Sequence, residues 1–424
     1  MNLKEIFQSR NLDLNIVLFG ASYLGKLAKY ALEHRKLSVH SFYDSDERKQ
    51  EKIFCEKKIL NFNQLSNLPK NTIFFVSNNY INSVTALLKQ MKFYDIFNCV
   101  ELCENTDFSK INMDLNEYES KYIEREIMFH KSACEKIFNS GKDILNLKCI
   151  DIAVTERCSM KCKDCSNLMQ YYLDPKNTEL EPLFKNLDKL MECVDWVYEF
   201  RILGGEPFMN KELYKILNKL VEYKNAGNVI IYTNATIIPK KENFEVLKNK
   251  KIELEITNYG NILSRKHDEL IKACGEANIK FRTKPPVGWT ECGTLKYYER
   301  SKEELERMFD NCCMRDVPAM MYGVLYRCPF AANATNLKAI PFGEEEVVNL
   351  NNEKYDVETL RKKIMNFNNS NKPLTACSYC GGRDYSSKAV EPGIQIKKPL
   401  KYKTIDVRQE HKNGINEKFK QQIK

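Results

Sequence analysis

Three cysteines lie close together in one loop of this 424-residue chain. Cys158, Cys162 and Cys165 follow an apolar run over 149–154 that predicts a short buried strand. Thiolates are the usual ligands of iron–sulfur clusters, which normally take four of them, so three thiolates leave one iron open to a small molecule. Zinc and inert core cysteines are the alternatives. Because zinc cysteines usually come as C-x2-C pairs in closed sites, the spacing favours a cluster.

A glycine pair followed by an acid comes after a second predicted strand. The strand begins near Phe200 and runs into Gly204, Gly205 and Glu206. Glycine has no Cβ, so a ligand can approach the backbone closely at this position. The Glu206 carboxylate is able to accept a charge-assisted hydrogen bond from an ammonium group. Taken alone, the run also fits a plain turn at the end of a strand.

Together the two motifs resemble the signature of the radical S-adenosylmethionine (SAM) enzymes. The resemblance implies a [4Fe–4S] cluster on the three cysteines, with SAM chelated to the open iron and its amino group held by the glycine run at 204–206. It further implies that the reduced cluster cleaves SAM to a 5′-deoxyadenosyl radical, which abstracts hydrogen from a substrate. Asp164 departs from the family pattern, in which the residue before the last cysteine is often aromatic.

Strand and helix patterns alternate after the glycine pair. They cover 228–234, 252–258 and 279–282 for the strands, and 211–223 and 264–277 for the helices. Such alternation indicates a parallel sheet with helices packed outside it. The family version is an incomplete (βα)6 barrel with its site at the carboxyl ends of the strands. Asn234 and Asn258 end two of these strands, and by resemblance they contact the SAM ribose, although polar residues commonly end strands.

Four side chains near the strand ends are candidates to face a substrate. They are Arg201, Tyr232, Tyr259 and Arg282. Each of them also fits a packed or solvated side chain, and the sequence does not identify the acid–base residue.

A second group of cysteines lies in the last third of the chain. It comprises Cys313, Cys328, Cys377 and Cys380. Gly323 fits a tight hairpin that brings the first two together. Cys312 lies beside Cys313 and leaves the first ligand ambiguous, and Cys292 is a stand-in for it or a spare cysteine. The layout resembles the twitch domain, the short form of the SPASM domain, and implies a second, auxiliary [4Fe–4S] cluster, with structural zinc as the alternative.

The first 110 residues predict a separate α/β unit. Gly20 to Gly25 follows an apolar strand in the manner of a dinucleotide-binding turn, but Ser22 replaces the middle glycine, which argues against bound NAD. Asp44 ends the second strand, where a ribose hydroxyl is held in such folds. The segment resembles the small Rossmann-like domains attached to sugar acetyltransferases and other enzymes of surface-glycan synthesis. A structural or docking role is the alternative.

These patterns predict an α/β fold: a partial (βα)6 radical SAM barrel with an N-terminal Rossmann-like parallel-sheet domain and a small cysteine-ligated C-terminal domain. The predicted divisions are the Rossmann-like domain at 1–110, a charged linker helix at 111–147, the barrel at 148–308, the twitch-like domain at 309–395 and a basic tail at 396–424.

Composition agrees with a cytoplasmic metalloprotein. The chain has 16 cysteines but no recognisable signal peptide, so its thiols are expected to serve metals and the core rather than disulfides. No apolar stretch is long enough to span a bilayer. The net charge is +9, with many cations in the tail. Few aromatics interleave with them, so a solvated end is expected rather than a nucleic-acid site.

The resemblance also suggests a reaction class. Radical SAM enzymes with a twitch domain include alcohol dehydrogenases that act on aminocyclitols, which implies a dehydrogenase-like oxidoreductase. Together with the glycan-related N-terminal domain, the resemblance predicts a sugar, nucleotide sugar or glycan precursor as the substrate. It also implies a flavodoxin- or ferredoxin-type electron donor. The alternatives are a peptide-modifying maturase and a non-catalytic iron–sulfur or zinc protein. The Gly-Gly-Glu run argues against the last, because an electron carrier does not need to bind SAM.

Overall fold

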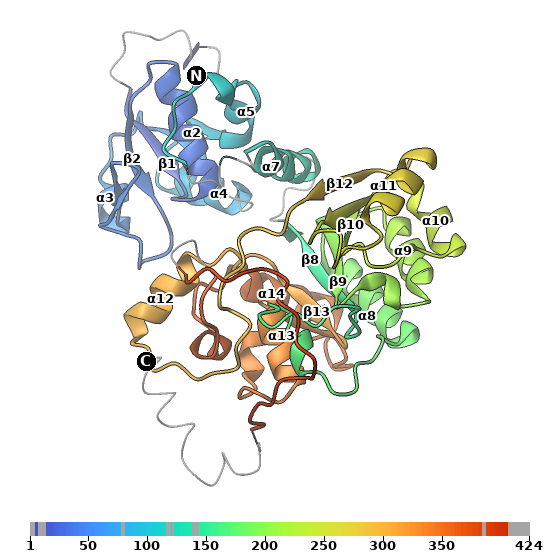
Figure 1. Ribbon diagram of the computed structural model, residues 1–424. Helices are drawn as coiled ribbons and strands as arrows, with labels where there is room; N and C mark the ends of the chain where they lie inside the picture. Colours follow the sequence, from blue (N-terminus) through green and yellow to red (C-terminus); the bar gives the residue numbers. More distant parts are fainter. Residues whose placement is uncertain are drawn as a thin grey trace. The chain divides into compact units, whose positions relative to one another are not determined.

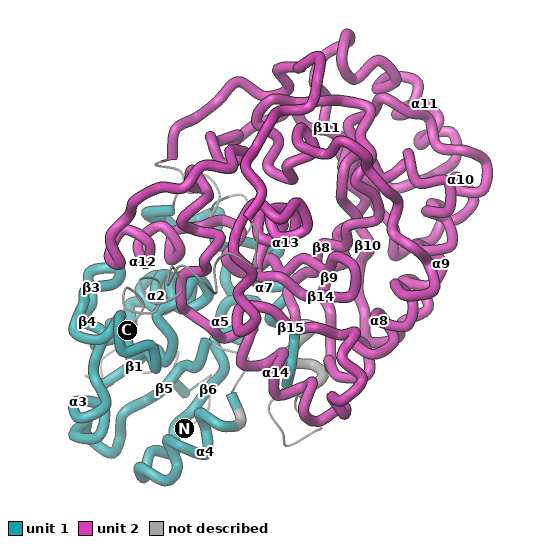
Figure 2. The backbone as a smooth tube through the Cα atoms, turned by 90° about the horizontal axis from the view of Figure 1, so that it is seen from below, with its two compact units in different colours: residues 1–146 teal, residues 147–424 magenta. Residues whose placement is uncertain are grey.

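The computed structural model describes residues 5–6, 14–77, 81–115, 120, 123–137, 144–383 and 387–405. The chain forms two compact units, residues 1–146 and 147–424 (Figure 2). Each unit is built on a largely parallel sheet, which confirms the predicted α/β class. None of the helices in the described part of the chain combines the length and apolar character needed to cross a membrane.

The first unit is a Rossmann-like sheet in the order β3-β4-β2-β1-β5-β6. Across this sheet the neighbouring strands from β4 through β2, β1 and β5 to β6 are all parallel, and β3 runs antiparallel to β4. Its elements are β1 (Ile16–Phe19), α2 (Tyr23–His34), β2 (Val39–Tyr43), β3 (Ile53–Phe54), β4 (Lys57–Leu60), α3 (Phe62–Ser66), β5 (Ile73–Val76), α4 (Ile81–Gln90), β6 (Ile96–Asn98), α5 (Cys99–Glu104), η1 (Phe108–Lys110) and α7 (Ile123–Ile137).

The central strand β1 supplies two separate cores. Its four residues are all buried, and they alternate between the two faces of the sheet. Ile16 and Leu18 pack with α2 and α5, whereas Val17 and Phe19 pack with α3 and α4. A parallel strand covered by helices on both faces is expected to be apolar throughout, as this one is.

The helix predicted as a linker packs on this first unit instead. Ile123 and Ile127 of α7 lie against the core formed by α2 and α5. The described residues of 111–137 therefore belong with the first unit, because Ile123 and Ile127 of the helix pack on its core.

The turn after β1 is closed by its own side chains. Gly20 has a φ of +115°, and a Cβ there would overlap the Ser77 hydroxyl. Ser22, which replaces the middle glycine of the dinucleotide pattern, caps α2 by accepting a hydrogen bond from the Gly25 amide at 3.2 Å. The substitution thus stabilises the start of the helix.

Asp44 is also engaged within the unit. Its Oδ2 accepts hydrogen bonds from the Ala21 amide at 2.9 Å and from Lys49 Nζ at 3.0 Å. Lys49 in turn donates to the Ala21 carbonyl. The ribose-binding role of Asp44 stays a prediction.

The second unit contains a sheet in the order β12-β11-β10-β9-β8-β13-β14-β15. Helices α8 to α11 lie along one side of its parallel strands (Figure 1). The strands are β7 (Asn146–Leu147), β8 (Ile150–Thr155), β9 (Trp196–Gly204), β10 (Ala226–Thr233), β11 (Ile252–Thr257), β12 (Phe281–Lys284), β13 (Ala319–Met321), β14 (Val324–Tyr326) and β15 (Val347–Asn349). The helices are η2 (Met169–Tyr171), α8 (Leu180–Cys193), η3 (Pro207–Met209), α9 (Leu213–Glu222), α10 (Lys241–Leu247), α11 (His267–Glu276), α12 (Lys302–Asp310), α13 (Pro329–Asn336), η4 (Glu344–Glu346), α14 (Val357–Asn369) and η5 (Thr375–Ser378).

The region predicted as a separate twitch-like domain extends the same sheet. Strand β13 pairs in parallel with β8, with Ala319 opposite Asp151. The hairpin of β13 and β14, with Gly323 at its turn, then adds antiparallel strands. The boundary predicted at 308/309 is therefore bridged by backbone hydrogen bonds, and residues 147–424 form one unit.

Candidate functional site

The three cysteines after β8 form one group of neighbouring thiols. Burial and, to a smaller extent, the nearby thiol of Cys165 raise the pKa of Cys162 to about 11. Burial and then Cys165 likewise raise the pKa of Cys158. Such thiols lose their protons on binding a metal, which replaces the lost solvation. Among the described residues, no three histidine, cysteine or acidic side chains form a set that would hold a single metal ion.

The sulfur atoms of this group receive N–H donors. The Met160 amide donates to Cys158, and the amides of Asn167 and Met169 donate to Cys165. Hydrogen bonds of this kind stabilise the charged thiolate and tune a cluster held by it. The donor set therefore fits a [4Fe–4S] cluster.

The glycine pair is required by the cysteine loop itself. Gly204 has a φ of +132°, and a Cβ there would overlap the Thr155 carbonyl oxygen. A Cβ on Gly205 would overlap the Arg157 carbonyl oxygen and crowd the Cys158 amide. The close approach predicted for a ligand is thus made by backbone, and it holds the end of β9 against the start of the loop.

Glu206 lies fully buried beside this loop. Its carboxylate accepts hydrogen bonds from the Thr233 hydroxyl and the Asn234 amide, both at 2.8 Å, and from the Phe208 amide at 3.3 Å. Burial raises its pKa to about 7, although the three donors act in the opposite direction. The side chain is therefore fixed in place and titrates near neutrality.

We expect SAM binding to depend on this titration. A carboxyl with a raised pKa is neutral below about pH 7, and a neutral carboxyl cannot pair with the SAM ammonium. Affinity should be full above about pH 7 and fall by about tenfold for each pH unit below it. Calorimetry with the reconstituted protein between about pH 5.5 and 8.5 measures this. Glu206→Gln should bind weakly with a flat profile, and a flat wild-type profile would contradict the expectation.

The two asparagines at strand ends lie in different settings. Asn234 Nδ2 is 3.3 Å from Ser159 Oγ and 3.7 Å from the sulfur of Cys158, so this residue lies at the cysteine loop. Asn258 accepts a hydrogen bond from the Gly260 amide and contacts His267 at 3.3 Å, within its own strand–helix connection. Contact of either residue with the SAM ribose stays a prediction.

Two of the substrate-facing candidates lie together on neighbouring strands. Arg201 Nε is 3.1 Å from Asp151, and its guanidinium lies 4.9 Å from the centre of the Tyr232 ring. Arg201 is opposite Asp151 in the register of β8 and β9, so the two side chains share one face of the sheet.

The other two candidates are separate from this pair. Arg282 is half-exposed, with Nε 2.7 Å from Glu253 and 3.1 Å from Glu255 on the neighbouring strand. Tyr259 lies near the cysteine loop, since burial and then the thiols of that loop raise its pKa. Of the four, Tyr259 is therefore the one that the fold brings closest to the cluster ligands.

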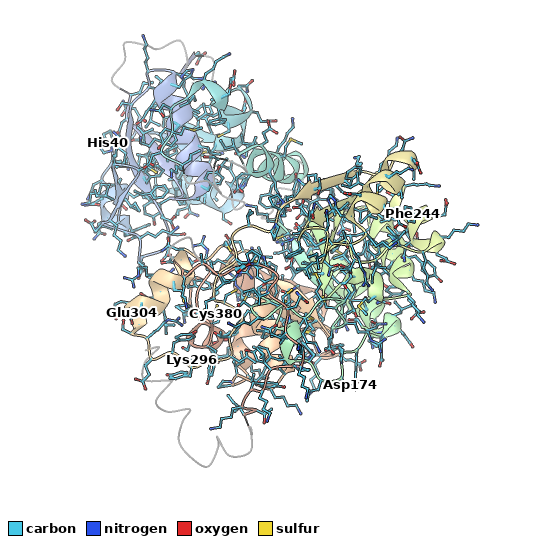
Figure 3. The ribbon with its side chains drawn as sticks, in the orientation of Figure 1. His40, Asp174, Phe244, Lys296, Glu304 and Cys380 are labelled. Carbon is cyan, nitrogen blue, oxygen red and sulfur yellow. The ribbon has the colours of Figure 1, made fainter. Side chains whose placement is uncertain are left out.

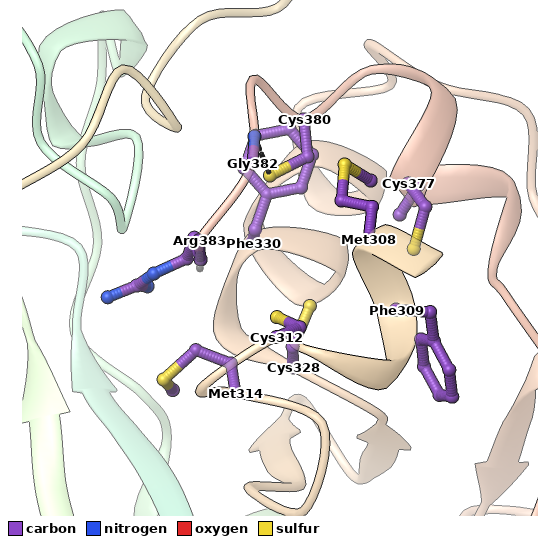
Figure 4. Close-up of a pocket in the computed structure, with 11 residues that line it drawn as sticks. Met308, Phe309, Cys312, Met314, Cys328, Phe330, Cys377, Cys380, Gly382 and Arg383 are labelled. Atoms are coloured by element: carbon purple, nitrogen blue, oxygen red, sulfur yellow. Dashed lines mark hydrogen bonds between the residues drawn. The ribbon is translucent and has the colours of Figure 1, made fainter. Parts of the chain in front are cut away.

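The second group of cysteines surrounds a pocket of about 420 Å³, part of which is open to solvent (Figure 4). Its cysteine lining is Cys312, Cys328, Cys377 and Cys380. Cys380, which follows η5, is marked among the side chains of the second unit in Figure 3. Burial raises its pKa to about 12. Met308 and Phe330 complete much of the apolar wall.

Cys313 does not line this pocket. Both Cys312 and Cys313 pack beside Cys149, Met314 and Val317, but only Cys312 also lines the pocket. The pocket lining therefore favours Cys312 over Cys313, and the identity of the first ligand stays a prediction. Cys292 is buried and neighbours both Cys165 and Cys380, but it is not part of the pocket lining.

All four pocket cysteines receive backbone N–H donors. The amides of Ala331, Leu374 and Gly382 lie 3.4 Å from the sulfurs of Cys328, Cys377 and Cys380, in that order. The Met314 amide donates to Cys312. Four thiols with amide donors match the donor chemistry of an iron–sulfur cluster, whereas no three such side chains of the described residues form a set for a single metal ion.

The described part of the predicted basic tail is bound to the unit. The Ile396 amide donates to the Lys161 carbonyl at 2.9 Å, and the Leu400 amide donates to the Gln170 carbonyl at 2.8 Å. Residues 396–405 are thus tied to the unit at a few backbone positions, while Lys397, Lys398, Lys401 and Lys403 stay exposed. Residues 406–424 lie outside the described residues. Gln395, which contacts Cys162, was missed by the sequence analysis and carries no local signal.

Comparison with known proteins supports the cluster in the first site. A family model described as a 4Fe-4S single cluster domain matches residues 149–269. A GTP 3',8-cyclase of Campylobacter lari is 33% identical over 92 residues, which are 21% of this chain and 28% of that protein. The GTP 3',8-cyclase of Clostridium acetobutylicum is 28% identical over 148 residues, 32% of this chain and 45% of that protein. The chain thus spans less than half the length of these relatives.

Solved structures are similar at a lower level. The crystal structure of BtrN in complex with AdoMet and 2-DOIA has a TM-score of 0.39 and 15% identity, covering 58% of this chain and 97% of that chain. The anSMEcpe structure with bound AdoMet has a TM-score of 0.37 and 12% identity, covering 66% and 98%.

The matched region holds both the three-cysteine loop and the Gly-Gly-Glu run. These matches support the predicted resemblance to the radical SAM enzymes. The family model supports a [4Fe–4S] cluster on the three-cysteine loop.

Proposed function

We propose that the chain is a radical SAM enzyme that reductively cleaves SAM and abstracts hydrogen from a sugar, nucleotide sugar or glycan precursor, with a dehydrogenase-like outcome. The supporting observation is the joining of two motifs in one site. The Glu206 amide donates to the Arg157 carbonyl at 2.8 Å, directly before Cys158. When bound, the reduced cluster and SAM supply the radical that removes the substrate hydrogen.

The chain's own groups bind and orient the cofactors. Cys158, Cys162 and Cys165 are the proposed ligands of the first cluster, and Glu206 is the proposed acceptor for the SAM ammonium. Because Glu206 is fully buried and held by three donors, its carboxylate is preorganised. A preorganised charge in a site that excludes water loses little energy to reorganisation during the reaction.

We propose a second [4Fe–4S] cluster on Cys312, Cys328, Cys377 and Cys380. This set replaces Cys313 by Cys312, since only the latter lines the pocket. The backbone donors to all four sulfurs support it. A second cluster in the same unit provides an acceptor for the electron that oxidation of an alcohol releases, whereas zinc in this place would be redox-inactive.

A polar face of the barrel sheet supports a hydrophilic substrate. The register of β8 to β12 brings charged and aromatic side chains onto one face, among them Asp151, Arg201, Tyr232, Glu255, Arg282 and Lys284. Lys284 pairs with Glu255 and lies 6.0 Å from the centre of the Tyr232 ring. Side chains of both charges and a tyrosine hydroxyl are suited to binding the hydroxyls of a sugar. The glycan-related resemblance of the N-terminal unit points to the same substrate class.

The test is a substrate screen with the reconstituted enzyme. The protein is reduced with dithionite, or with flavodoxin or ferredoxin as the proposed physiological donor, and given SAM with nucleotide sugars, sugar phosphates or peptides. We expect a nucleotide sugar or sugar phosphate to raise 5′-deoxyadenosine formation by about tenfold, with a product that lacks two hydrogens. Stimulation by a peptide alone would establish a maturase. Absence of SAM cleavage despite full cluster content would favour a non-catalytic protein.

A further inference from the structure

Residues 393–402 cross the three-cysteine loop and are called the strap here. The Lys163 amide donates to the Ile394 carbonyl at 2.7 Å, and the Ile396 amide donates to the Lys161 carbonyl at 2.9 Å. These two bonds make an antiparallel bridge between Cys162 and Gln395. The loop that carries the three cysteines is thus paired by backbone to a segment far along the chain.

The strap is set at both ends. Gly393 has a φ of +79° after Pro392, as in a type II turn, and a Cβ there would lie 3.0 Å from the Tyr259 ring. At the other end, the Leu400 amide donates to the Gln170 carbonyl at 2.8 Å and the Tyr402 hydroxyl to the Leu337 carbonyl at 3.1 Å. The strap therefore holds its position without help from the Gln395 side chain.

The orientation of the Gln395 amide follows from its neighbours. Its Oε1 lies 2.7 Å from the Lys161 amide, which can only donate. Its Nε2 lies 2.7 Å from the Gly393 carbonyl, which can only accept, and 3.2 Å from the sulfur of Cys162. Backbone groups thus determine which end of the amide is which, and an N–H must point at the sulfur.

Cys162 differs from its two partners in the source of this donor. Backbone amides within the loop or directly after it donate to Cys158 and Cys165. The donor identified for Cys162 is the Gln395 side chain, 233 residues further on. Gln395 is itself exposed, while Cys162 is 8% exposed, so the amide covers a sulfur that the loop leaves uncovered.

We infer that Gln395 is a positioning residue for the first cluster: its N–H···S hydrogen bond to Cys162 raises the reduction potential of that cluster and so eases its reduction. Hydrogen bonds to cluster sulfurs stabilise the more negative, reduced state and are a recognised determinant of cluster potential. The inference rests on the proposed role of Cys162 as a cluster ligand.

The test compares Gln395→Leu and Gln395→Glu with wild type in the full-length, reconstituted chain. Redox titration followed by electron paramagnetic resonance gives the midpoint potential, and the signal that SAM perturbs identifies the first cluster. We expect Gln395→Leu to lower the potential while iron content stays at wild-type level, because the strap keeps its backbone bonds. Gln395→Glu should lower it further, because a carboxylate then faces the thiolate.

Lys397→Leu is the matched control, since it changes an exposed residue of the same strap and should leave the potential unchanged. An unchanged potential in both Gln395 variants would overturn the inference. Loss of about four irons from Gln395→Leu would also overturn it, because the contact would then be needed to retain the cluster rather than to set its reduction potential. The potential is measured without turnover, so a wild type that does not cleave SAM would reject the proposed function separately.

Discussion

Cys158→Ala is expected to abolish 5′-deoxyadenosine formation and to lower bound iron from about eight to about four per chain. Cys158 begins the loop, and the end of β9 is packed directly against its amide. With one of three thiolates missing, the first cluster has too few ligands, while the pocket of the second group is untouched. The measurement is iron and sulfide content after anaerobic reconstitution, with deoxyadenosine assayed after reduction.

Cys274→Ala is the matched control for this change. Cys274 is fully buried in α11 and belongs to neither cysteine group, so its replacement removes a buried thiol without touching a cluster. It should keep about eight irons and full SAM cleavage. If Cys158→Ala kept either its iron or its SAM cleavage, the assignment of the first cluster to this loop would be wrong.

The largest contrast between two neighbouring substitutions is expected at Cys312 and Cys313. Cys312→Ala should lose about four irons, because it removes a wall of the second pocket, whereas Cys313→Ala should keep about eight. SAM cleavage should persist in both variants, since the first site is intact. Product formation should be lost only in Cys312→Ala, because the second cluster is the proposed electron acceptor.

Metal analysis of the same proteins decides between cluster and zinc. A reversed pattern, with iron lost only in Cys313→Ala, would contradict the ligand set drawn from the pocket. About four irons with one zinc in wild type would remove the electron acceptor and point to a redox-neutral reaction.

The loop cysteines and the glycine run could be predicted because their signals are local. A C-x3-C-x2-C run after a buried strand, and a Gly-Gly-Glu run ending the next, carry their meaning in a few consecutive residues. The parallel sheets were predictable for a related reason, since strand and helix periodicity is also local. The resemblance to radical SAM enzymes depended on these local signals alone.

The structural requirement for glycine at 204 and 205 was not predictable from local signals. The sequence suggested that a ligand approaches Gly205, whereas the space a Cβ would need is occupied by the Arg157 carbonyl. The linker helix and the start of the tail differ from their predicted roles for the same reason. Each contacts residues that are distant along the chain.

The sequence by itself indicated the resemblance to radical SAM enzymes and the three cysteines of the first group, because short-range spacing encodes them. Only the tertiary structure decided that Cys312 rather than Cys313 faces the second pocket, and that Gln395 meets Cys162. The first choice depends on the direction of two adjacent side chains, and the second on a pairing across 233 residues. Neither leaves a periodic or spaced pattern in the chain, because packing between distant segments, not local propensity, sets such contacts.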